Sequence, residues 1–148
     1  VVGGGPAGST MAALLAREGR KVVLLEKAHH PRFHIGESLL PMNLPILERL
    51  GVLEQVRAMG TLKLGADFPV HDADDTTHVF RFDRALDPKF GYAFQVRRSE
   101  FDQILFRNAA HGGISVVYRR PDGNVGWIDP ERTVKSINGH GSVNGSGV

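Results

Sequence analysis

The chain opens with Val1-Val2-Gly3-Gly4-Gly5-Pro6-Ala7-Gly8-Ser9, in which three glycines follow the spacing Gly-x-Gly-x-x-Gly. A short apolar run precedes these glycines and a helical pattern follows them. A second apolar run, Val22-Val23-Leu24-Leu25, ends in the acid Glu26, eighteen residues after Gly8. A strand, a glycine turn, a helix and a second strand that ends in an acid predict a nucleotide-binding fold of the Rossmann type.

Each residue of the glycine turn has its own expected role. Gly3 allows a tight turn, Gly5 lets a diphosphate approach the backbone, and Gly8 lets the helix pack closely on the strand. Pro6 suits the first helical turn, because its missing N–H would have no partner there. Ala7 lies in the first turn of the expected helix. The unpaired N–H groups and the positive dipole end of that helix would face the phosphates of a bound nucleotide.

The acid at the end of the second strand predicts which nucleotide is bound. Glu26 can accept hydrogen bonds from the two hydroxyls of a ribose, and a carboxylate there disfavours a 2′-phosphate. The pattern therefore predicts FAD or NAD rather than NADP. The alternative is a glycine-rich turn without a ligand, and the register of strand, helix, strand and acid favours nucleotide binding.

Composition restricts the classes of protein and of site that the chain can form. The 148 residues are 41% hydrophobic and 23% charged, as in one globular domain with a core. The absence of cysteine excludes disulfides, thiolate zinc sites and a cysteine nucleophile, and fits a cytoplasmic protein. A net charge of +2 with scattered basic residues predicts no nucleic-acid partner, and no apolar run is long enough to cross a membrane. Only two residues precede the glycines, so we expect an incomplete chain from a larger protein.

Apolar periodicity predicts the other elements. Helices are expected at 6–18, 42–50, 52–59 and 100–110. Buried strands of a parallel sheet are expected at 21–25 and 114–118, and antiparallel strands at 62–68, 77–82 and 92–96. Ser99 and Asp102 are expected to form a capping box for the last helix. The predicted fold is α/β, with a partial Rossmann-like domain over residues 1–118, a small antiparallel β insertion near 62–96, and an irregular or disordered tail at 119–148.

Three histidines between the second strand and the next helix raise the question of a metal site. His29, His30 and His34 lie within six residues. No nearby spacing places two imidazoles and a carboxylate on one helix face, as a metal site on a helix requires. We therefore expect solvated loop histidines and no metal ion.

Four segments resemble the N-terminal part of the flavin-dependent halogenases, within the FAD-dependent aromatic monooxygenases, and together they extend over roughly residues 1–113. The most specific is the Gly-Glu-Ser-x-x-Pro element in the second segment. The four are the glycine stretch with Glu26-Lys27; Pro31-Arg32-Phe33-His34-Ile35-Gly36-Glu37-Ser38-Leu39-Leu40-Pro41; Lys63-Leu64-Gly65-Ala66-Asp67-Phe68; and Arg98-Ser99-Glu100-Phe101-Asp102-Gln103-Ile104-Leu105.

This resemblance implies FAD as the cofactor. It also implies which residues hold the ADP half of FAD: Gly3, Gly5, Pro6, Ala7, Gly8, Glu26 and Lys27. Near the flavin end it places Gly36, Glu37 and Ser38. Arg98 would contact the phosphates or the ribityl chain, which suits the forked donors of a guanidinium. The alternative for Arg98 is a solvated charge beside Arg97.

The same resemblance implies a catalytic role for Lys63. In such halogenases the flavin, oxygen and halide yield hypohalous acid, which the lysine ammonium holds beside an electron-rich aromatic carbon. The implied partners are a small aromatic substrate, a halide and a separate flavin reductase. The alternative for Lys63 is a solvated strand lysine.

The chain also departs from the halogenase pattern. It contains one tryptophan, Trp127, so the family's Trp-x-Trp-x-Ile-Pro element is absent from it. We also expect the family's substrate-binding half to lie outside these 148 residues, and therefore little or no turnover from them alone. Two alternatives remain: an FAD-dependent reductase of the geranylgeranyl-reductase type, and a truncated nucleotide-binding chain without catalysis. Lys63 and the Gly-Glu-Ser element favour a halogenase over that reductase.

Overall fold

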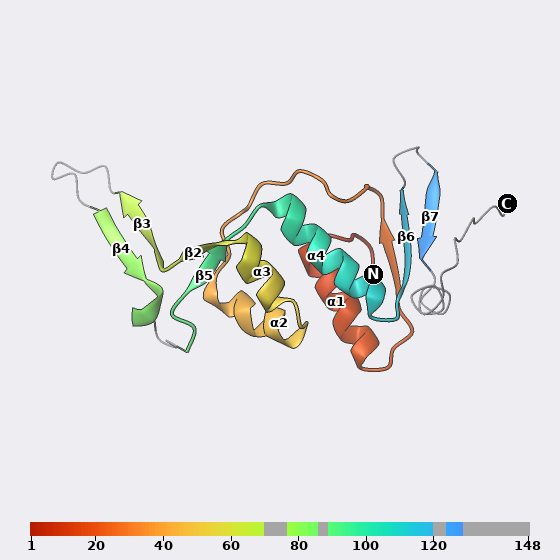
Figure 1. The fold of residues 1–148 in the computed structure, drawn as a ribbon, viewed down its shortest axis with the longest axis horizontal. Coiled ribbons are helices and arrows are strands. Elements are labelled where there is room, and N and C mark those ends of the chain that lie inside the picture. The colour runs from red at the N-terminus through yellow and green to blue at the C-terminus, as the bar shows by residue number, and fades with distance from the viewer. Residues whose placement is uncertain (70–76, 86–88, 120–123, 129–148) are drawn as a thin grey trace. The chain divides into compact units, whose positions relative to one another are not determined.

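The computed structural model describes residues 1–69, 77–85, 89–119 and 124–128. Its contacts divide the chain into two compact units (Figure 1). The first unit comprises Val1–Arg32 together with the chain from Leu105 onward, and the second comprises Phe33–Ile104. Helix α4 (Arg98–His111) contributes residues to both units.

The first unit contains a sheet with the strand order β1-β6-β7. Strand β1 (Val23–Glu26) pairs in parallel with β6 (Ser115–Arg119), and β7 (Val125–Ile128) pairs antiparallel with β6. Val2 adds an isolated parallel bridge to Leu25 of β1. The parallel pairing confirms the expected Rossmann-like arrangement at this end of the chain.

One side of this sheet is covered by helices α1 (Pro6–Arg17) and α4 (Figure 1). Side chains alternate across a strand, so Leu24 is buried while Val23 and Leu25 are 46% and 44% exposed. The prediction that this strand is buried without alternation was therefore wrong. Continuous burial requires layers on both faces, and in the described residues both helices lie on the same one.

Helix α1 confirms the most regular pattern in the sequence. It begins at Pro6 after Gly5, whose carbonyl accepts the first helical hydrogen bond from the Ser9 N–H at 2.9 Å. Ala12 and Ala13 are buried, because their small side chains permit close packing. Gly19 follows the helix with φ +75°, a conformation that favours glycine.

The second unit combines short helices with two small antiparallel sheets. Strand β2 (Thr61–Lys63) pairs with β5 (Ala93–Gln95), and β3 (Gly65–Pro69) pairs with β4 (Thr77–Arg81). The core is mostly aliphatic and includes Leu44, Leu47, Leu50, Val52, Val56 and Phe94. The remaining elements are a 3-10 turn at Pro41–Asn43, α2 (Leu44–Arg49), α3 (Leu53–Met59) and a 3-10 turn at Phe82–Arg84.

The single strand expected at 62–68 is two strands. The chain changes partners at Leu64, whose carbonyl accepts a hydrogen bond from the Phe82 N–H at 3.0 Å. Gly65 then lies so close to Phe80 that an added Cβ would collide with the Phe80 carbonyl oxygen. A glycine at this position thus lets the hairpin begin immediately after the turn from β2.

Helix α4 begins at Arg98, two residues earlier than expected. Ser99 is consequently inside the helix, and the predicted capping box was wrong. The carboxylate of Asp102 accepts hydrogen bonds from the Arg98 side chain instead. Capping signals fix a helix start only to within a residue or two. Here the carboxylate of Asp102 pairs with Arg98, four residues earlier in the same helix.

The tail expected to be irregular contributes one strand, β7, at Val125–Ile128. Its pairing with β6 was missed because the run is short and follows the sequence Pro-Asp-Gly-Asn, from which only a turn was predicted. Residues 129–148, for which disorder was expected, lie outside the described residues. In the described part of the chain, no helix is both long enough and apolar enough to cross a membrane.

Candidate functional site

The glycine turn has the close contacts expected from its spacing. Gly3 has φ +95°, in the region that favours glycine. A Cβ added to Gly8 would collide with the carbonyl oxygen of Gly3, so α1 approaches the turn more closely than any other residue type would allow. The conformational roles predicted for these two glycines are confirmed.

Gly4 is held by two side chains, those of Glu26 and Ser9. Its N–H donates to Glu26 Oε2 at 2.5 Å, and its carbonyl accepts a hydrogen bond from the buried Ser9 hydroxyl at 2.9 Å. A Cβ at Gly4 would lie 2.8 Å from the ring of Phe106 and 3.0 Å from Glu26 Oε2. The turn is therefore fixed by side chains from α1 and from the end of β1.

Glu26 is buried, with 6% of its surface exposed. Its second oxygen, Oε1, accepts a hydrogen bond from the Ala28 N–H at 2.7 Å. Burial raises the pKa of Glu26, but the hydrogen bonds from Ala28 and Gly4 and the nearby Arg32 and His30 outweigh it, so the pKa is lowered. The carboxylate is thus ionised and faces the turn, as the sequence pattern predicted.

Arg32 is a residue of this cluster that the sequence analysis missed. Its Nη2 lies 3.5 Å from Glu26 Oε2, and a Cβ at Gly5 would lie 3.4 Å from the same nitrogen. The guanidinium, whose side chain is 20% exposed, therefore lies beside the turn at the point where a diphosphate was expected. Its place in the Pro31–Pro41 segment was noted, but no signal distinguished it from a solvated loop arginine.

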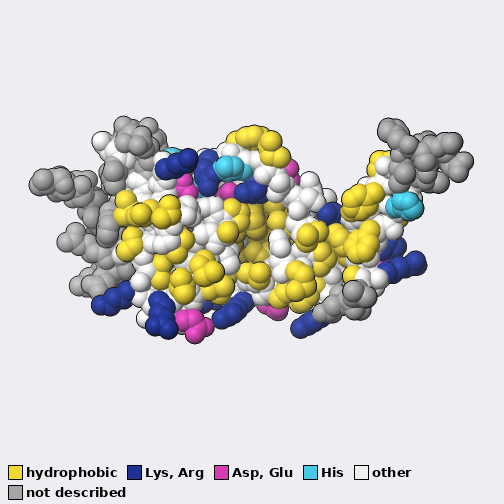
Figure 2. Space-filling view, turned by 180° about the vertical axis from the view of Figure 1, so that it is seen from behind, with side chains coloured by type: hydrophobic (Ala, Val, Ile, Leu, Met, Phe, Trp, Pro, Cys, Tyr) yellow, Lys and Arg dark blue, Asp and Glu magenta, His cyan; other side chains and the backbone are white. Residues whose placement is uncertain are grey.

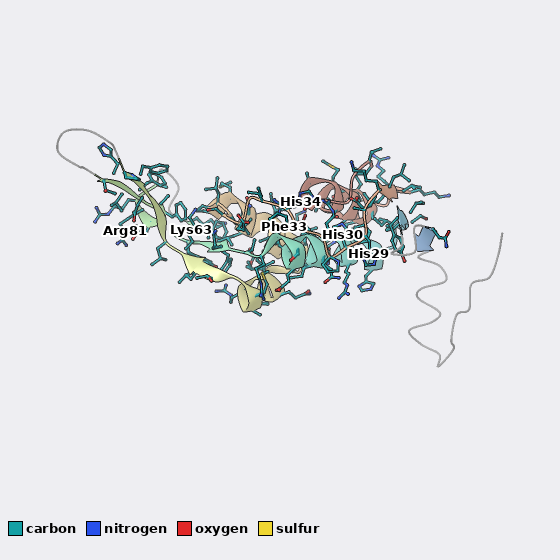
Figure 3. All side chains as sticks on the ribbon, turned by 90° about the horizontal axis from the view of Figure 1, so that it is seen from above. His29, His30, Phe33, His34, Lys63 and Arg81 are labelled. Carbon is teal, nitrogen blue, oxygen red and sulfur yellow. The ribbon has the colours of Figure 1, made fainter. Side chains whose placement is uncertain are left out.

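The three histidines labelled in Figure 3 have different environments. His29 and His34 are exposed, as expected. His30 is buried and stacks on the ring of Phe106, with centroids 4.5 Å apart, so its expected solvation was wrong. Within the described residues, no group of three or more His, Cys, Asp or Glu side chains could hold a metal ion.

A second cluster, in the second unit, surrounds Arg98. Its Nε and Nη2 donate to the two oxygens of Asp102 at 2.8 and 3.2 Å, and Asp102 is completely buried. Its Nη1 donates to the carbonyls of Ile35 at 2.7 Å and Gly36 at 3.5 Å. The hydrogen bond with Asp102 raises the pKa of Arg98, although burial opposes this. Arg98 is therefore not the solvated charge of the alternative interpretation.

The Gly-Glu-Ser segment is attached to the edge of β5. The Glu37 carbonyl accepts a hydrogen bond from the Val96 N–H at 2.8 Å, the Leu39 N–H donates to the Phe94 carbonyl at 3.0 Å, and Ser38 forms a bridge with Gln95. These contacts attach residues 37–39 to β5 through one isolated bridge and two backbone hydrogen bonds.

Lys63, labelled in Figure 3, ends strand β2, and its side chain reaches this segment. Its Nζ donates to the Ser38 hydroxyl oxygen at 2.6 Å and lies 5.2 Å from the centroid of the Phe82 ring. The side chain is therefore held between a hydroxyl and an aromatic face. These contacts are more than the alternative of a solvated strand lysine predicts.

An apolar hollow of about 540 Å³ adjoins Phe82 in the same unit. Several apolar side chains at its rim are exposed, and Figure 2 shows hydrophobic side chains over the hairpin of β3 and β4. The lining consists of Leu40, Ala66, Phe68, His78, Val79, Phe80 and Phe82.

The site residues predicted from the sequence thus form two clusters. The glycine turn and Glu26 belong to the first unit, and the Gly-Glu-Ser segment, Lys63 and Arg98 belong to the second. Lys27 is exposed beside Glu26.

The family model of tryptophan halogenases matches residues 1–88. A model of the C terminus of sigma 54 modulation/S30EA ribosomal proteins matches the shorter range 93–126. The chain is 48% identical over 117 residues to a tryptophan 2-halogenase of Chondromyces crocatus, covering 78% of this chain and 21% of the relative. It is 46% identical over 114 residues to a flavin-dependent halogenase of Metacordyceps chlamydosporia, covering 76% and 20%.

The fold is similar to that of solved halogenases. The myxobacterial chondrochloren halogenase, described as a variant of FAD-dependent halogenases, superposes with a TM-score of 0.71 at 32% identity. That likeness covers 86% of this chain and 34% of the solved one. The chain spans about a fifth of the length of the curated relatives it matches.

Proposed function

Because the chain belongs to the tryptophan halogenase family, we propose that it is the N-terminal, FAD-binding part of a flavin-dependent halogenase that acts on an aromatic substrate. The observation that carries this proposal is the glycine turn of α1, held by the ionised carboxylate of Glu26 through the Gly4 N–H. A turn of this kind is the ADP-binding end of dinucleotide folds.

The residues of the first unit fit the ADP half of FAD. Gly5 provides no side-chain cap for α1, which leaves the N–H groups at this helix end for a diphosphate. Arg32 would supply a positive charge beside it. Glu26 accepts hydrogen bonds from the Gly4 and Ala28 N–H groups and from Arg32 Nη2, so about one of the four or so acceptor positions of its carboxylate remains for a ribose hydroxyl. The residues proposed to hold this half are Gly3, Gly5, Pro6, Ala7, Gly8, Glu26, Lys27 and Arg32.

The second unit would hold the flavin end at Gly36, Glu37 and Ser38. Arg98 already donates to Asp102 and to the carbonyl of Ile35, so few of its five N–H groups remain for a cofactor. Its main contribution in this proposal is to fix the turn at Gly36, where φ is +104°. A direct contact with FAD would be its second role.

Lys63 is the proposed catalytic residue. FAD, once reduced, would supply the oxidising chemistry with oxygen and halide, and Lys63 would hold the oxidised halogen through its ammonium. The apolar hollow beside Phe82 has the character that an aromatic substrate requires. A halide, a separate flavin reductase and a cytoplasmic location complete the proposal.

A binding titration tests the cofactor assignment on this chain directly. We expect FAD to bind, with its fluorescence quenched, and Glu26→Ala to weaken binding at least about tenfold because charge-assisted hydrogen bonds to the ribose are lost. The matched control is Glu54→Ala, which removes a carboxylate whose side chain is 81% exposed on α3. Unchanged affinity in Glu26→Ala would contradict the assignment.

A chimera tests the catalytic assignment. The matched residues of this chain would replace their counterparts in the Chondromyces crocatus tryptophan 2-halogenase, which is 48% identical there. We expect Lys63→Ala to abolish halogenation while FAD binding and flavin reoxidation persist, and Lys21→Ala, on an exposed lysine, to retain activity. Loss of FAD binding in Lys63→Ala would make the residue structural, and halogenation that persists in Lys63→Ala would contradict its catalytic role.

A further inference from the structure

The contact between Lys63 and Ser38 joins two segments that are 25 positions apart in the sequence. We propose that Ser38 is a positioning residue: its hydroxyl oxygen accepts a hydrogen bond from the Lys63 ammonium and fixes where that ammonium points. The family resemblance placed Ser38 only near the flavin and gave it no part in orienting the lysine. The inference rests on the proposed function in treating Lys63 as the catalytic group.

The backbone around Ser38 is rigidly attached, so its hydroxyl is a fixed acceptor. Ser38 pairs with Gln95 in an isolated antiparallel bridge, and hydrogen bonds on either side join Glu37 to Val96 and Leu39 to Phe94. Residues 37–39 therefore cannot move independently of β5.

The same strand fixes the backbone of Lys63 from its other edge. In the register of β2 and β5, Thr61 lies opposite Gln95 and Lys63 lies opposite Ala93. Strand β5 thus lies between the segment that carries the serine and the strand that carries the lysine. The 2.6 Å bond from Nζ to Oγ spans this strand and links the two.

A second contact defines the direction of the ammonium. Nζ lies 5.2 Å from the centre of the Phe82 ring, within the range of a cation–π interaction, and Phe82 is 3% exposed. Phe82 also lines the apolar hollow between the hairpin and Leu40. A lysine has four rotatable bonds and loses considerable entropy when held, so two simultaneous contacts indicate a selected orientation of the ammonium between Ser38 and the Phe82 ring.

A flexible lysine would pass a reactive halogen to many positions of a substrate, whereas a fixed ammonium restricts it to one. Ser38 would therefore affect the rate and regioselectivity of halogenation without itself touching the substrate. Arg98 supports the same segment from its other end through the carbonyl of Ile35.

Selective acylation of lysines tests the proposal without cofactor or turnover. The chain is treated at low occupancy with the N-hydroxysuccinimide ester of acetic acid, and each lysine's rate is measured by peptide mass spectrometry. A nitrogen that donates a short hydrogen bond must release it before attacking the ester. We expect Ser38→Ala to raise the Lys63 rate roughly two- to tenfold, the range for losing one hydrogen bond.

Controls separate positioning from general loosening. The exposed Lys21 and Lys27 serve as internal standards in every sample. Ser38→Thr retains the hydroxyl and should restore the original Lys63 rate. Ser99→Ala removes a hydroxyl on α4 in the same unit and should leave it unchanged.

The outcomes decide the proposal. A selective rise at Lys63 in Ser38→Ala, reversed in Ser38→Thr, supports it. An unchanged Lys63 rate in Ser38→Ala, an equal rise at all lysines, or failure of Ser38→Thr to reverse the effect would each overturn it. The acylation rates are measured without FAD. Failure of FAD to bind in the titration above would therefore contradict the proposed function, while the Lys63 rates would still test the contact between Ser38 and Lys63.

Discussion

The ion pair between Arg98 and Asp102 yields the sharpest prediction of stability. Asp102 is completely buried, and both its oxygens accept hydrogen bonds from Arg98, at 2.8 and 3.2 Å. Asp102→Asn preserves the side-chain volume but removes the charge and replaces one acceptor by an NH₂ donor. The NH₂ then faces a guanidinium N–H, so one hydrogen bond is lost and two donors oppose each other.

The magnitude follows from the geometry. A hydrogen bond to a charged group contributes about 1.5–3 kcal/mol, and removing one partner of a fully buried pair costs about 3–5 kcal/mol. The Arg98 side chain is 17% exposed, so water partly compensates it and the upper figure does not apply. We expect Asp102→Asn to lower the free energy of unfolding by about 2–4 kcal/mol, out of a typical total of about 5–15 kcal/mol.

Urea unfolding followed by circular dichroism measures this change, and the melting temperature should fall by roughly 5–12 °C. The matched control is Glu100→Gln, which removes the partner of Arg97 in a pair whose side chains are 75% and 40% exposed. Such surface pairs contribute about 0–1 kcal/mol. A loss of unfolding free energy in Asp102→Asn no larger than in Glu100→Gln would show that the buried ion pair does not stabilise the fold.

Three further predictions concern the first unit. Folding lowers the pKa of Glu26 from its ordinary value of 4.5, so the stabilisation that its carboxylate provides is present above pH 4.5 and is lost as the pH falls through the folded pKa. Glu26→Gln should therefore flatten the acid dependence of stability, measured by urea unfolding from pH 7 to pH 3. A profile unchanged by Glu26→Gln would contradict the lowered pKa. Gly8→Ala should lower the melting temperature far more than Gly5→Ala. The Cβ added at position 8 would collide with the backbone of Gly3, whereas the Cβ added at position 5 would meet only the Arg32 side chain. Leu24→Ala should cost about 2–5 kcal/mol and Leu25→Ala less than about 1 kcal/mol, since only Leu24 is buried; equal costs would contradict the one-sided sheet.

The sequence predicted those features of the fold that depend on local geometry. The spacing of the glycines predicted a tight turn at Gly3, which has a positive φ, and a close approach of the helix at Gly8. Both features are possible because glycine has no Cβ. The parallel pairing of β1 and β6 followed from two apolar runs separated by helices. Neither inference required knowledge of distant contacts.

The features that were missed depend on partners far apart in the sequence. The break at Leu64 is invisible in a run of strand-forming residues, because it arises when β2 and β3 choose different partners. The one-sided burial of β1 depends on which faces α1 and α4 cover, which hydrophobicity alone does not encode. His30 was expected in solvent because its neighbours are polar, but it stacks on Phe106, 76 positions later.

In the candidate site, too, the sequence identified residues by local spacing or motif and missed contacts that depend on the fold. Glu26 was identified by its distance from the glycines, whereas Arg32 became visible only through its position beside Gly5. Arg98 was identified as important from its motif, and the structure shows what it holds: the Asp102 carboxylate and the Ile35 carbonyl. The cofactor roles of these residues stay predictions, to be decided by the titrations proposed above.

The hydrogen bonds of the second unit suggest why the Gly-Glu-Ser element is the most specific part of the sequence resemblance. Within four residues the segment offers the Gly36 conformation that accommodates Arg98, the backbone of Glu37 that pairs with β5, and the hydroxyl of Ser38 that meets Lys63. The three contacts involve three different residues, so few other sequences at positions 36–38 would make all three. A substitution at Gly36 should therefore disturb Lys63 through Ser38, although Gly36 itself lies beside Arg98 and not beside the lysine.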